Sequence, residues 1–346
     1  MESRRSFFKK ITLGAGLAAA GLGPTILSAT PSRKYPIIGH GNFQYRLKQD
    51  WGTQNPNKIP VKDCHEMVQV RDGRLFMLTN HTRNNILIYN RSGKVLDTWT
   101  IGASGAHGLT LSDEGGEEFL YITDSENHQV FKTDLSGNVL MEIGFPSMVH
   151  EIESAGKWKP TETAIAPNGD IYIADGYGTN LIVQYNSKGE YIRHFGGKGR
   201  DAGKFDCAHG VTLDTRRGTP ELLITSRTAN EFQRLTLEGE HLETISLPGC
   251  WICRPVIRGT NLYFATIVTK SWYEYDGMIA VLDENNQVVS LPGGSEPQYE
   301  GGKLLPPTSD LTSFMNPHDV CIDQDENIYV PQWYSGRTYP VMLERV

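Results

Sequence analysis

The feature that most limits the fold of this chain is a repeated unit of short strands. Each unit alternates apolar and polar residues along its strands and places Gly, Asn or Asp at the turns between them. Six such units begin at residues 65, 107, 161, 209, 253 and 318, so successive starts are 42 to 65 residues apart. A period of roughly 40–50 residues that is built only from short strands predicts a β-propeller.

The two ends of the chain predict how the ring of blades closes. The sixth unit ends after its third strand, while the segment 43–52 resembles the outer strands VLDTWTIG and YIRHFGG of other units. Pairing this segment with the last unit would close the ring and remove its exposed edges. We therefore expect one all-β domain over residues 30–346, a six-bladed β-propeller whose last blade is closed by an N-terminal strand.

Two segments in the middle of the chain resemble NHL repeats. They are the linker GGKGRDAGKFDCAHGV and the strand with its turn IYIADGYGTN. The resemblance covers most of the chain after the N-terminal segment. It implies the propeller fold and says little about function.

Residues 1–29 predict an export signal. Paired arginines, Arg4 and Arg5, are followed by Phe and Lys and then by an apolar run, with Ala29 as a small residue for cleavage. The pair resembles a twin-arginine (Tat) signal, which implies export of the folded protein to the periplasm or the cell exterior. A membrane anchor is the alternative. Gly and Pro residues interrupt the run, so we expect no stable membrane span after signal cleavage.

Composition limits the kinds of binding partner that we expect for this chain. The chain has 33 Lys and Arg against 40 Asp and Glu, and no basic run beyond the N-terminus, so we expect no nucleic-acid partner. We expect a monomer that takes a small-molecule or peptide-derived substrate. The five cysteines cannot all pair within one chain, which leaves buried free thiols or one disulfide open. The cysteines are Cys64, Cys207, Cys250, Cys253 and Cys321.

The first residues of the six units carry the chemical signal. They are, in order, His65, His107, Thr161, His209, Cys253 and His318. The innermost strand of each blade lines the channel, so histidines on blades two, four and six would converge on its axis. Three imidazoles with an open fourth position suit a catalytic zinc, although imidazole also suits copper, iron and nickel. The alternative is that these histidines bond to water or to backbone groups.

Carboxylates follow three of these first residues. Glu66, Glu162 and Asp319 lie one position further along their strands. They could orient metal ligands or bind a hard cation such as calcium. A hydrogen bond between blades is the alternative for Glu66 and Glu162, whereas Asp319 directly follows a predicted metal ligand.

Several short motifs together resemble peptidyl-α-hydroxyglycine α-amidating lyase. They are Ala106-His107-Gly108-Leu109, Ile173-Ala174-Asp175-Gly176-Tyr177, Ala208-His209-Gly210, Ser226-Arg227 and Asn316-Pro317-His318-Asp319-Val320. The resemblance implies an NHL propeller that cleaves peptidyl-α-hydroxyglycine to a peptide amide and glyoxylate. It also implies a zinc ion on three histidines and a structural calcium ion.

The resemblance assigns roles residue by residue. The implied zinc ligands are His107, His209 and His318; the implied base is Tyr177; the implied active-site arginine is Arg227; and the implied calcium ligands are the Met67 and Leu109 carbonyls with the Asp319 carboxylate. Metal binding would lower the pKa of a substrate hydroxyl, a phenolate could take its proton, and an arginine suits a carboxylate. Aromatic packing remains the alternative for the tyrosine, and a salt bridge for the arginine.

The sequence departs from that pattern in the first blade. Where the resemblance implies a second active-site arginine, the chain has Thr79-Asn80-His81, and the nearest arginine is Arg83. His65 and Cys253 in the channel layer likewise indicate altered metal surroundings. The metal site could therefore persist with a different substrate.

Two classes of function remain open. One is a zinc-dependent lyase or a related hydrolase. The other is a non-catalytic exported propeller that binds a protein or ligand through its top face. Aromatic residues of the last two blades could serve either class; they are Trp251, Trp272, Trp333 and Tyr334.

Overall fold

The computed structural model describes residues 35–271, 274, 276–333 and 338–346. The predicted export signal and the side chains of Trp272 and Tyr334 lie outside these residues. Residues 35–346 form one compact unit. In the part of the chain that the structure describes, no helix is long and apolar enough to span a bilayer.

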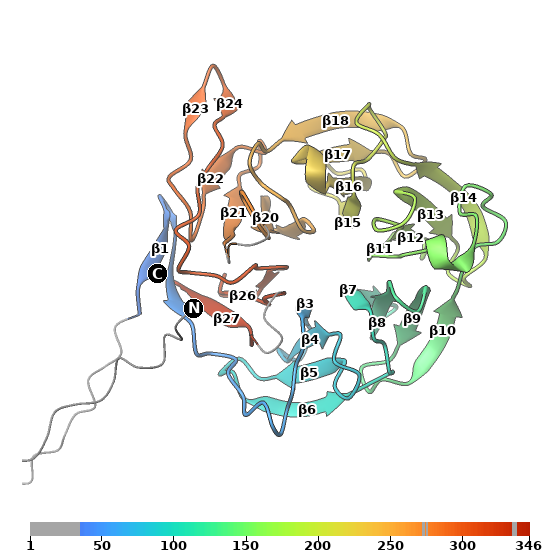
Figure 1. Cartoon of the computed structure of the whole chain (residues 1–346), viewed down its shortest axis with the longest axis horizontal. Coiled ribbons are helices and arrows are strands. Elements are labelled where there is room, and N and C mark those ends of the chain that lie inside the picture. The colour runs from blue at the N-terminus through green and yellow to red at the C-terminus, as the bar shows by residue number, and fades with distance from the viewer. Residues whose placement is uncertain (1–34, 272–273, 275, 334–337) are drawn as a thin grey trace, which may run out of the picture. The chain divides into compact units, whose positions relative to one another are not determined.

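The unit is a six-bladed β-propeller, as the repeats predict, with six antiparallel sheets arranged around a central channel (Figure 1). Blade 1 contains β3 (Cys64–Gln69), β4 (Leu75–Thr79), β5 (Ile86–Tyr89) and β6 (Val95–Trp99). Blade 2 contains β7 (Ala106–Glu114), β8 (Glu117–Asp124), β9 (Gln129–Thr133) and β10 (Val139–Ile143). Blade 3 contains β11 (Glu162–Ile165), β12 (Ile171–Ala174), β13 (Leu181–Tyr185) and β14 (Tyr191–Gly196).

The second half of the ring repeats this order. Blade 4 contains β15 (Ala208–Asp214), β16 (Glu221–Ser226), β17 (Glu231–Leu235) and β18 (His241–Ser246). Blade 5 contains β19 (Val256–Arg258), β20 (Asn261–Thr266), β21 (Met278–Leu282) and β22 (Val288–Ser290). Blade 6 contains β25 (Cys321–Ile322), β26 (Ile328–Val330), β27 (Val341–Arg345), β2 (Phe43–Lys48) and β1 (Ile37–His40). A separate hairpin is formed by β23 (Tyr299–Glu300) and β24 (Lys303–Leu304).

The predicted closure by an N-terminal strand is confirmed. Strand β2 pairs antiparallel with β27, with Leu47 opposite Leu343, and so supplies the outer strand that blade 6 lacks. Tyr45 and Leu47 are buried in the hydrophobic cluster between blades 5 and 6, which fixes the register of the strand. Strand β1 adds a fifth strand outside β2, which the repeat pattern does not predict.

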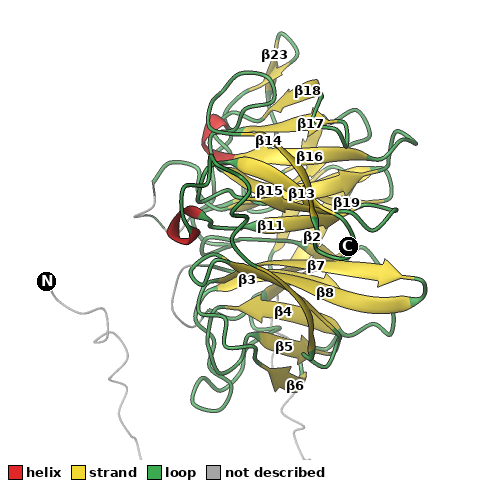
Figure 2. Cartoon of the chain, turned by 90° about the vertical axis from the view of Figure 1, so that its right-hand side faces the viewer, coloured by secondary structure: helices red, strands yellow, loops and turns green. Residues whose placement is uncertain are grey.

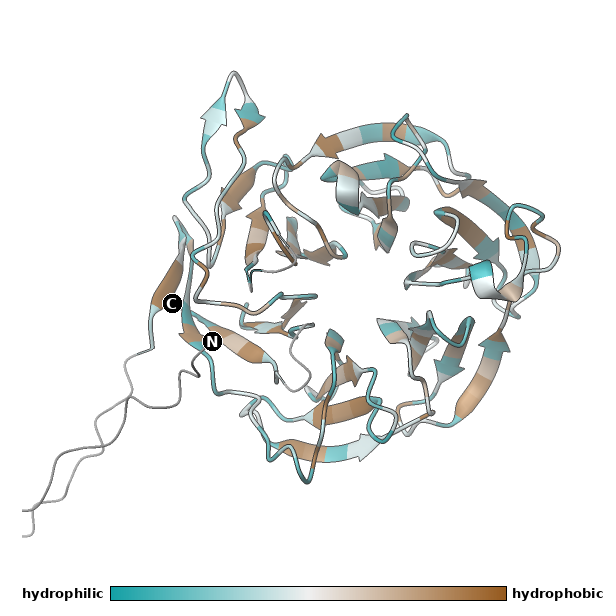
Figure 3. Ribbon diagram, in the orientation of Figure 1, coloured by the Kyte–Doolittle hydropathy of each residue, from teal (hydrophilic) through white to brown (hydrophobic). Residues whose placement is uncertain are grey.

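The core consists of six hydrophobic clusters, and each lies between two neighbouring blades. In β4, Phe76 packs toward blade 2, while Met77 packs toward blade 6. Successive side chains of a strand point to opposite faces, so the middle strands of a blade are apolar on both sides. Figure 3 shows brown, hydrophobic segments in the strands of the blades.

Two short 3₁₀ turns, η1 (Ala155–Lys157) and η2 (Arg227–Ala229), lie on one face of the ring, and the β7–β8 turn extends on the other (Figure 2). The channel therefore has two distinct mouths. All five cysteines are free thiols, and all but Cys207 are buried. Of the two alternatives that the sequence leaves open, free thiols or one disulfide, the structure shows free thiols.

Candidate active site at one end of the channel

Four buried histidines meet at the channel axis. His65 lies in β3, His107 in β7, His209 in β15 and His318 in the segment before β25. The ring of His107 lies 4.7 Å from those of His65 and His209 and 4.9 Å from that of His318. The structure thus brings the three predicted metal ligands together and adds His65 to them.

Backbone carbonyls orient two of these rings. His107 Nδ1 lies 2.8 Å from the Thr161 carbonyl oxygen, and His318 Nδ1 lies 3.0 Å from the His65 carbonyl oxygen. A carbonyl oxygen only accepts, so each Nδ1 carries the proton and each Nε2 carries a lone pair. This is how a protein holds a metal-binding histidine in the correct tautomer.

Several nitrogens of the cluster have no hydrogen-bond partner among the described residues. They are His65 Nδ1, His209 Nδ1 and His318 Nε2. Buried polar atoms are almost always paired, so an unpaired group of this kind needs an explanation such as an ion or a ligand. Burial lowers the pKa of His107 to about 3 and the pKa of the other three well below the usual value. The imidazoles are therefore neutral, which is the state that binds metal.

The spacing of the nitrogens fits one ion. The ligand atoms of His65, His107 and His318 lie within 4.8 Å of one another, and His107 Nε2 lies 3.1 Å from His209 Nε2. Tetrahedral zinc with Zn–N bonds of about 2.0–2.1 Å places its nitrogens about 3.3–3.4 Å apart. The residues present therefore fit a transition metal: His65, His107 and His318 form the group that can hold one ion, and His209 adjoins this group through His107.

Tyr177 lies in the turn after β12, beside the histidines. Its hydroxyl is 3.0 Å from His107 Nε2, and 43% of the residue is exposed toward the mouth. The turn comes this close because both neighbours are glycines: a Cβ at Gly176 would lie 2.2 Å from the Ala208 carbonyl oxygen, and one at Gly178 would lie 2.3 Å from Asp175. Burial raises the pKa of Tyr177 to about 12, and the charge of Arg227 opposes that shift.

Arg227, the first residue of η2, lies next to this tyrosine. Its Nε donates to the Ile252 carbonyl at 3.0 Å, its Nη2 to Cys253 Sγ at 3.3 Å, and its Nη1 to the Tyr177 hydroxyl at 3.4 Å. No carboxylate among the described residues forms an ion pair with it. The salt-bridge alternative for this residue is therefore not what the structure shows, and its charge is available to an anionic ligand.

His65, His107, Tyr177 and Arg227 line a cavity of about 740 Å³ on the face that carries η2. Trp251 and Trp333 also line it, as does Asn80, which stands where the resemblance implies a second arginine. The Asn80 side chain donates to Asp63 at 2.9 Å and accepts from the Asp63 backbone at 3.0 Å. Lys62 lies on the same rim.

The predicted calcium ligands also lie together, but toward the other end of the channel. The Met67 and Leu109 carbonyls and the Asp319 carboxylate all accept hydrogen bonds from the guanidinium of Arg254. With this side chain among them, the three groups do not fit a calcium ion. The sequence interpretation missed Arg254. A signal existed: Arg254 directly follows Cys253, at the position where three other units carry a carboxylate.

Fold and cluster together define a six-bladed β-propeller with a buried histidine cluster at one mouth of its channel. No family model matches the chain. Part of it is 37% identical over 109 residues to a probable peptidyl-alpha-hydroxyglycine alpha-amidating lyase of Caenorhabditis elegans, which is 31% of this chain and 30% of that protein. Peptidyl-alpha-hydroxyglycine alpha-amidating lyase 1 of Drosophila melanogaster is 27% identical over 252 residues, 65% of this chain and 42% of that protein.

Another relative carries no enzyme name. NHL repeat-containing protein 3 of Homo sapiens is 27% identical over 137 residues, which is 38% of this chain and 40% of that protein. The chain thus spans less than half the length of these curated relatives. The names of the two lyase relatives suggest an enzyme of lyase type.

Solved structures agree on the fold. A gluconolactonase from Xanthomonas campestris superposes with a TM-score of 0.60 at 12% identity, over 90% of this chain and 94% of that one. A virginiamycin B lyase from Staphylococcus aureus superposes with a TM-score of 0.54 at 15% identity, over 90% and 94% of the two chains. At such identities the likeness shows the propeller alone.

Proposed function

We propose that this protein is a metal-dependent lyase that cleaves an α-hydroxylated amide or a similar carbinol at the histidine mouth of the channel. The observation that carries the proposal is the convergence of neutral, partly unpaired histidine nitrogens with a phenol and an unpaired arginine in one cavity. The lyase names of two sequence relatives support the same reaction class.

In this proposal His107, His209 and His318 would hold a zinc ion, and His65 of blade 1 would be a further candidate ligand. A bound zinc ion supplies a Lewis acid that lowers the pKa of a substrate hydroxyl. Two of the four rings are held ready by carbonyl acceptors on their Nδ1 atoms. Their Nε2 lone pairs therefore need no rotation to bind.

Tyr177 is the proposed base. Its phenolate would take the proton of the substrate hydroxyl, the C–O bond would become a carbonyl as the C–N bond breaks, and the departing amide nitrogen would take a proton. The proton that Tyr177 takes from the hydroxyl is the one that would pass to the departing nitrogen, which returns the phenolate. The Tyr177 hydroxyl lies 3.0 Å from His107 Nε2, within reach of a group bound at the cluster. Burial raises the pKa of this tyrosine, and the positive charge of Arg227 beside it acts in the opposite direction, toward the phenolate.

Arg227 is the proposed anchor of a substrate carboxylate. Its Nε and Nη2 are held by the Ile252 carbonyl and by Cys253, which leaves Nη1 facing the tyrosine and the cavity. An arginine fixed in this way binds an anion with little loss of side-chain entropy. Since Asn80 replaces the other implied arginine, we expect a weaker grip on the substrate than two arginines would give.

The direct test supplies peptidyl-α-hydroxyglycine to zinc-loaded protein and measures glyoxylate. We expect glyoxylate above the level of a metal-stripped control, and restoration when zinc is returned. The control variant is His241→Ala, which changes a histidine of strand β18, and it should behave as the parent protein. No glyoxylate above the stripped control would reject the lyase proposal for this substrate.

The alternative function is an exported propeller that binds a protein or ligand without catalysis. Trp251 and Trp333 on the cavity wall favour it, since aromatic side chains are common at binding surfaces. It predicts ligand binding that survives removal of metal. The same glyoxylate assay separates the two functions.

We also propose that the protein leaves the cytoplasm folded, through the Tat route, and works as a monomer in the periplasm or outside the cell. The paired arginines Arg4 and Arg5 support the route. Changing both to lysine should retain the protein in the cytoplasm. Export that is unaffected by this change would contradict the proposal.

A further inference from the structure

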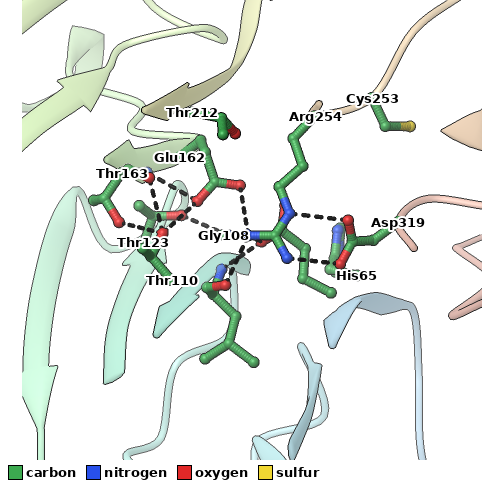
Figure 4. Close-up of polar contacts among 12 residues, drawn as sticks. His65, Gly108, Thr110, Thr123, Glu162, Thr163, Thr212, Cys253, Arg254 and Asp319 are labelled. Atoms are coloured by element: carbon green, nitrogen blue, oxygen red, sulfur yellow. Dashed lines mark hydrogen bonds and ion pairs between the residues drawn. The ribbon is translucent and has the colours of Figure 1, made fainter. Parts of the chain in front are cut away.

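A buried arginine crosses the channel axis below the histidine cluster. Arg254, in the segment before β19, is 8% exposed. Its Nε and Nη2 each lie 2.9 Å from one oxygen of the Asp319 carboxylate. Its Nη1 lies 2.9 Å from the Leu109 carbonyl oxygen, and its Nη2 lies 3.4 Å from the Met67 carbonyl oxygen. Figure 4 shows the guanidinium of Arg254 between Asp319 and Glu162.

Further carboxylates surround the same guanidinium. Nη1 lies 3.2 Å from Glu66 Oε2 and 3.8 Å from Glu162 Oε2. The Glu66 carboxylate also accepts from the Leu109 backbone N–H at 2.6 Å, and Asp319 accepts from the Met67 backbone N–H at 3.0 Å. Three buried carboxylates from three blades therefore share one cationic side chain.

The second residues of the six units form a layer in which glycines lie beside long side chains. They are, in blade order, Glu66, Gly108, Glu162, Gly210, Arg254 and Asp319. A Cβ at Gly210 would lie 2.6 Å from the Arg254 Cα, and a Cβ at Gly108 would lie 2.5 Å from the Thr161 carbonyl oxygen. The two glycines thus leave the space that the long side chain and its carboxylate partners fill.

The acceptors of Arg254 are the kind of oxygens that bind a hard cation. Calcium takes backbone carbonyls and carboxylates at about 2.3–2.6 Å. An ion at that distance from Met67 O, Leu109 O and Asp319 would overlap the guanidinium nitrogens, which lie 2.9–3.4 Å from the same oxygens. Guanidinium and ion therefore exclude each other.

We propose that Arg254 is a built-in cation that makes this propeller independent of calcium, and that its removal uncovers a divalent-cation site. The guanidinium pairs with carboxylates of blades 1, 3 and 6 and bonds to carbonyls of blades 1 and 2. It thereby holds the inner segments that carry His65 and His318. Each of these histidines directly precedes a carboxylate residue that Arg254 binds. This inference does not depend on the proposed lyase activity.

An ion can reach the uncovered site from solvent. Arg254, Met67 and Thr110 line a cavity of about 880 Å³ on the face of the ring that carries the β7–β8 turn. With a shorter side chain at position 254, the cavity would extend to the oxygens of Met67, Leu109 and Asp319. Glu66 would supply a fourth oxygen donor.

The test compares thermal unfolding of the full chain and of Arg254→Ala, each in EGTA and in millimolar calcium chloride, with calorimetric titration of calcium. We expect the parent protein to unfold at the same temperature in both buffers and to bind no calcium at the channel. Arg254→Ala should unfold at a lower temperature in EGTA. Calcium should recover most of that loss and bind at about one equivalent, with a dissociation constant on the order of 10⁻³ M or tighter.

Two variants make the result specific. Arg258→Ala removes an exposed arginine of β19 and should gain no calcium binding. Arg254→Ala combined with Asp319→Asn should lose the calcium recovery, because the anionic ligand is gone. A parent protein that EGTA destabilises, or a folded Arg254→Ala that binds no calcium, would overturn the proposal. The parent measurement stands even where the variant fails to fold.

Discussion

The two ends of the channel are built from neighbouring residues and reach opposite outcomes. His65 and His318 face one end, while Glu66 and Asp319, the next residues in the chain, face the other. At the histidine end, several nitrogens have no partner within the described chain. At the arginine end, Arg254 supplies the cation itself. The two ends thus differ in the cation: the histidine end holds unpaired neutral nitrogens, whereas the arginine end holds a guanidinium that hydrogen-bonds to Asp319 and to the Met67 and Leu109 carbonyls.

The largest expected effect comes from removing a histidine at the histidine end of the channel. His209→Ala and His318→Ala should each lose most bound zinc, and activity should fall to the level of the stripped protein, because two imidazoles bind far more weakly than three. Metal analysis of the purified variants measures this. His65→Ala should keep more zinc than either, since it adds a fourth ligand to a complete triad. Full metal retention in His209→Ala would contradict the assignment, and His241→Ala serves as the control.

The next effect separates chemistry from metal binding at the same end. Tyr177→Phe removes the base and should lower turnover by roughly 10²–10⁴. Zinc content should stay at the parent level because the tyrosine is not a proposed ligand. Steady-state kinetics with metal analysis measure both quantities. A variant that loses zinc along with turnover would show that the hydroxyl supports the metal instead.

The third expected effect is at the arginine end of the channel, and it is a loss of stability. Arg254→Met keeps much of the side-chain volume but leaves three buried carboxylates without a cation. Breaking a buried ion pair from one side costs about 3–5 kcal/mol of unfolding free energy. Denaturant unfolding in EGTA measures the loss. A loss below about 1 kcal/mol, the range of an exposed pair, would mean that the charges are not held as the structure shows.

The smallest effect concerns substrate binding at the histidine end. Arg227→Ala should raise KM for carboxylate-bearing substrates about 10- to 100-fold and change kcat less, because one charged hydrogen bond is lost. Stability should also fall, because Arg227 is buried and its hydrogen bonds to the Ile252 carbonyl and to Cys253 are lost, so KM is measured on the folded variant. Lys62→Ala on the rim is the matched control and should raise KM less. An equal effect of the two variants would place the anion elsewhere in the cavity.

Much of the fold follows from local pattern. The repeats predict six blades, and the short last unit predicts that segment 43–52 supplies an outer strand, which β2 does. The same alignment of units places His107, His209 and His318 in one layer. Tyr177 and Arg227 come from the resemblance to the amidating lyases, and the structure places both beside that layer. Strand β1 was not predicted, because its residues repeat no unit and pair only with a neighbour already outside the ring.

The sequence by itself determined the ring and its histidine layer, because strand alternation and turn residues are local signals that recur with every blade. Only the tertiary structure decided what fills the layer below. Arg254 meets Met67, Leu109 and Asp319 across the channel axis, from positions 65 to 187 residues away in the chain. Which long side chain reaches across depends on the space that Gly210 leaves beside it. The repeat places Arg254 in this layer, but the groups that it meets are set by packing among all six blades.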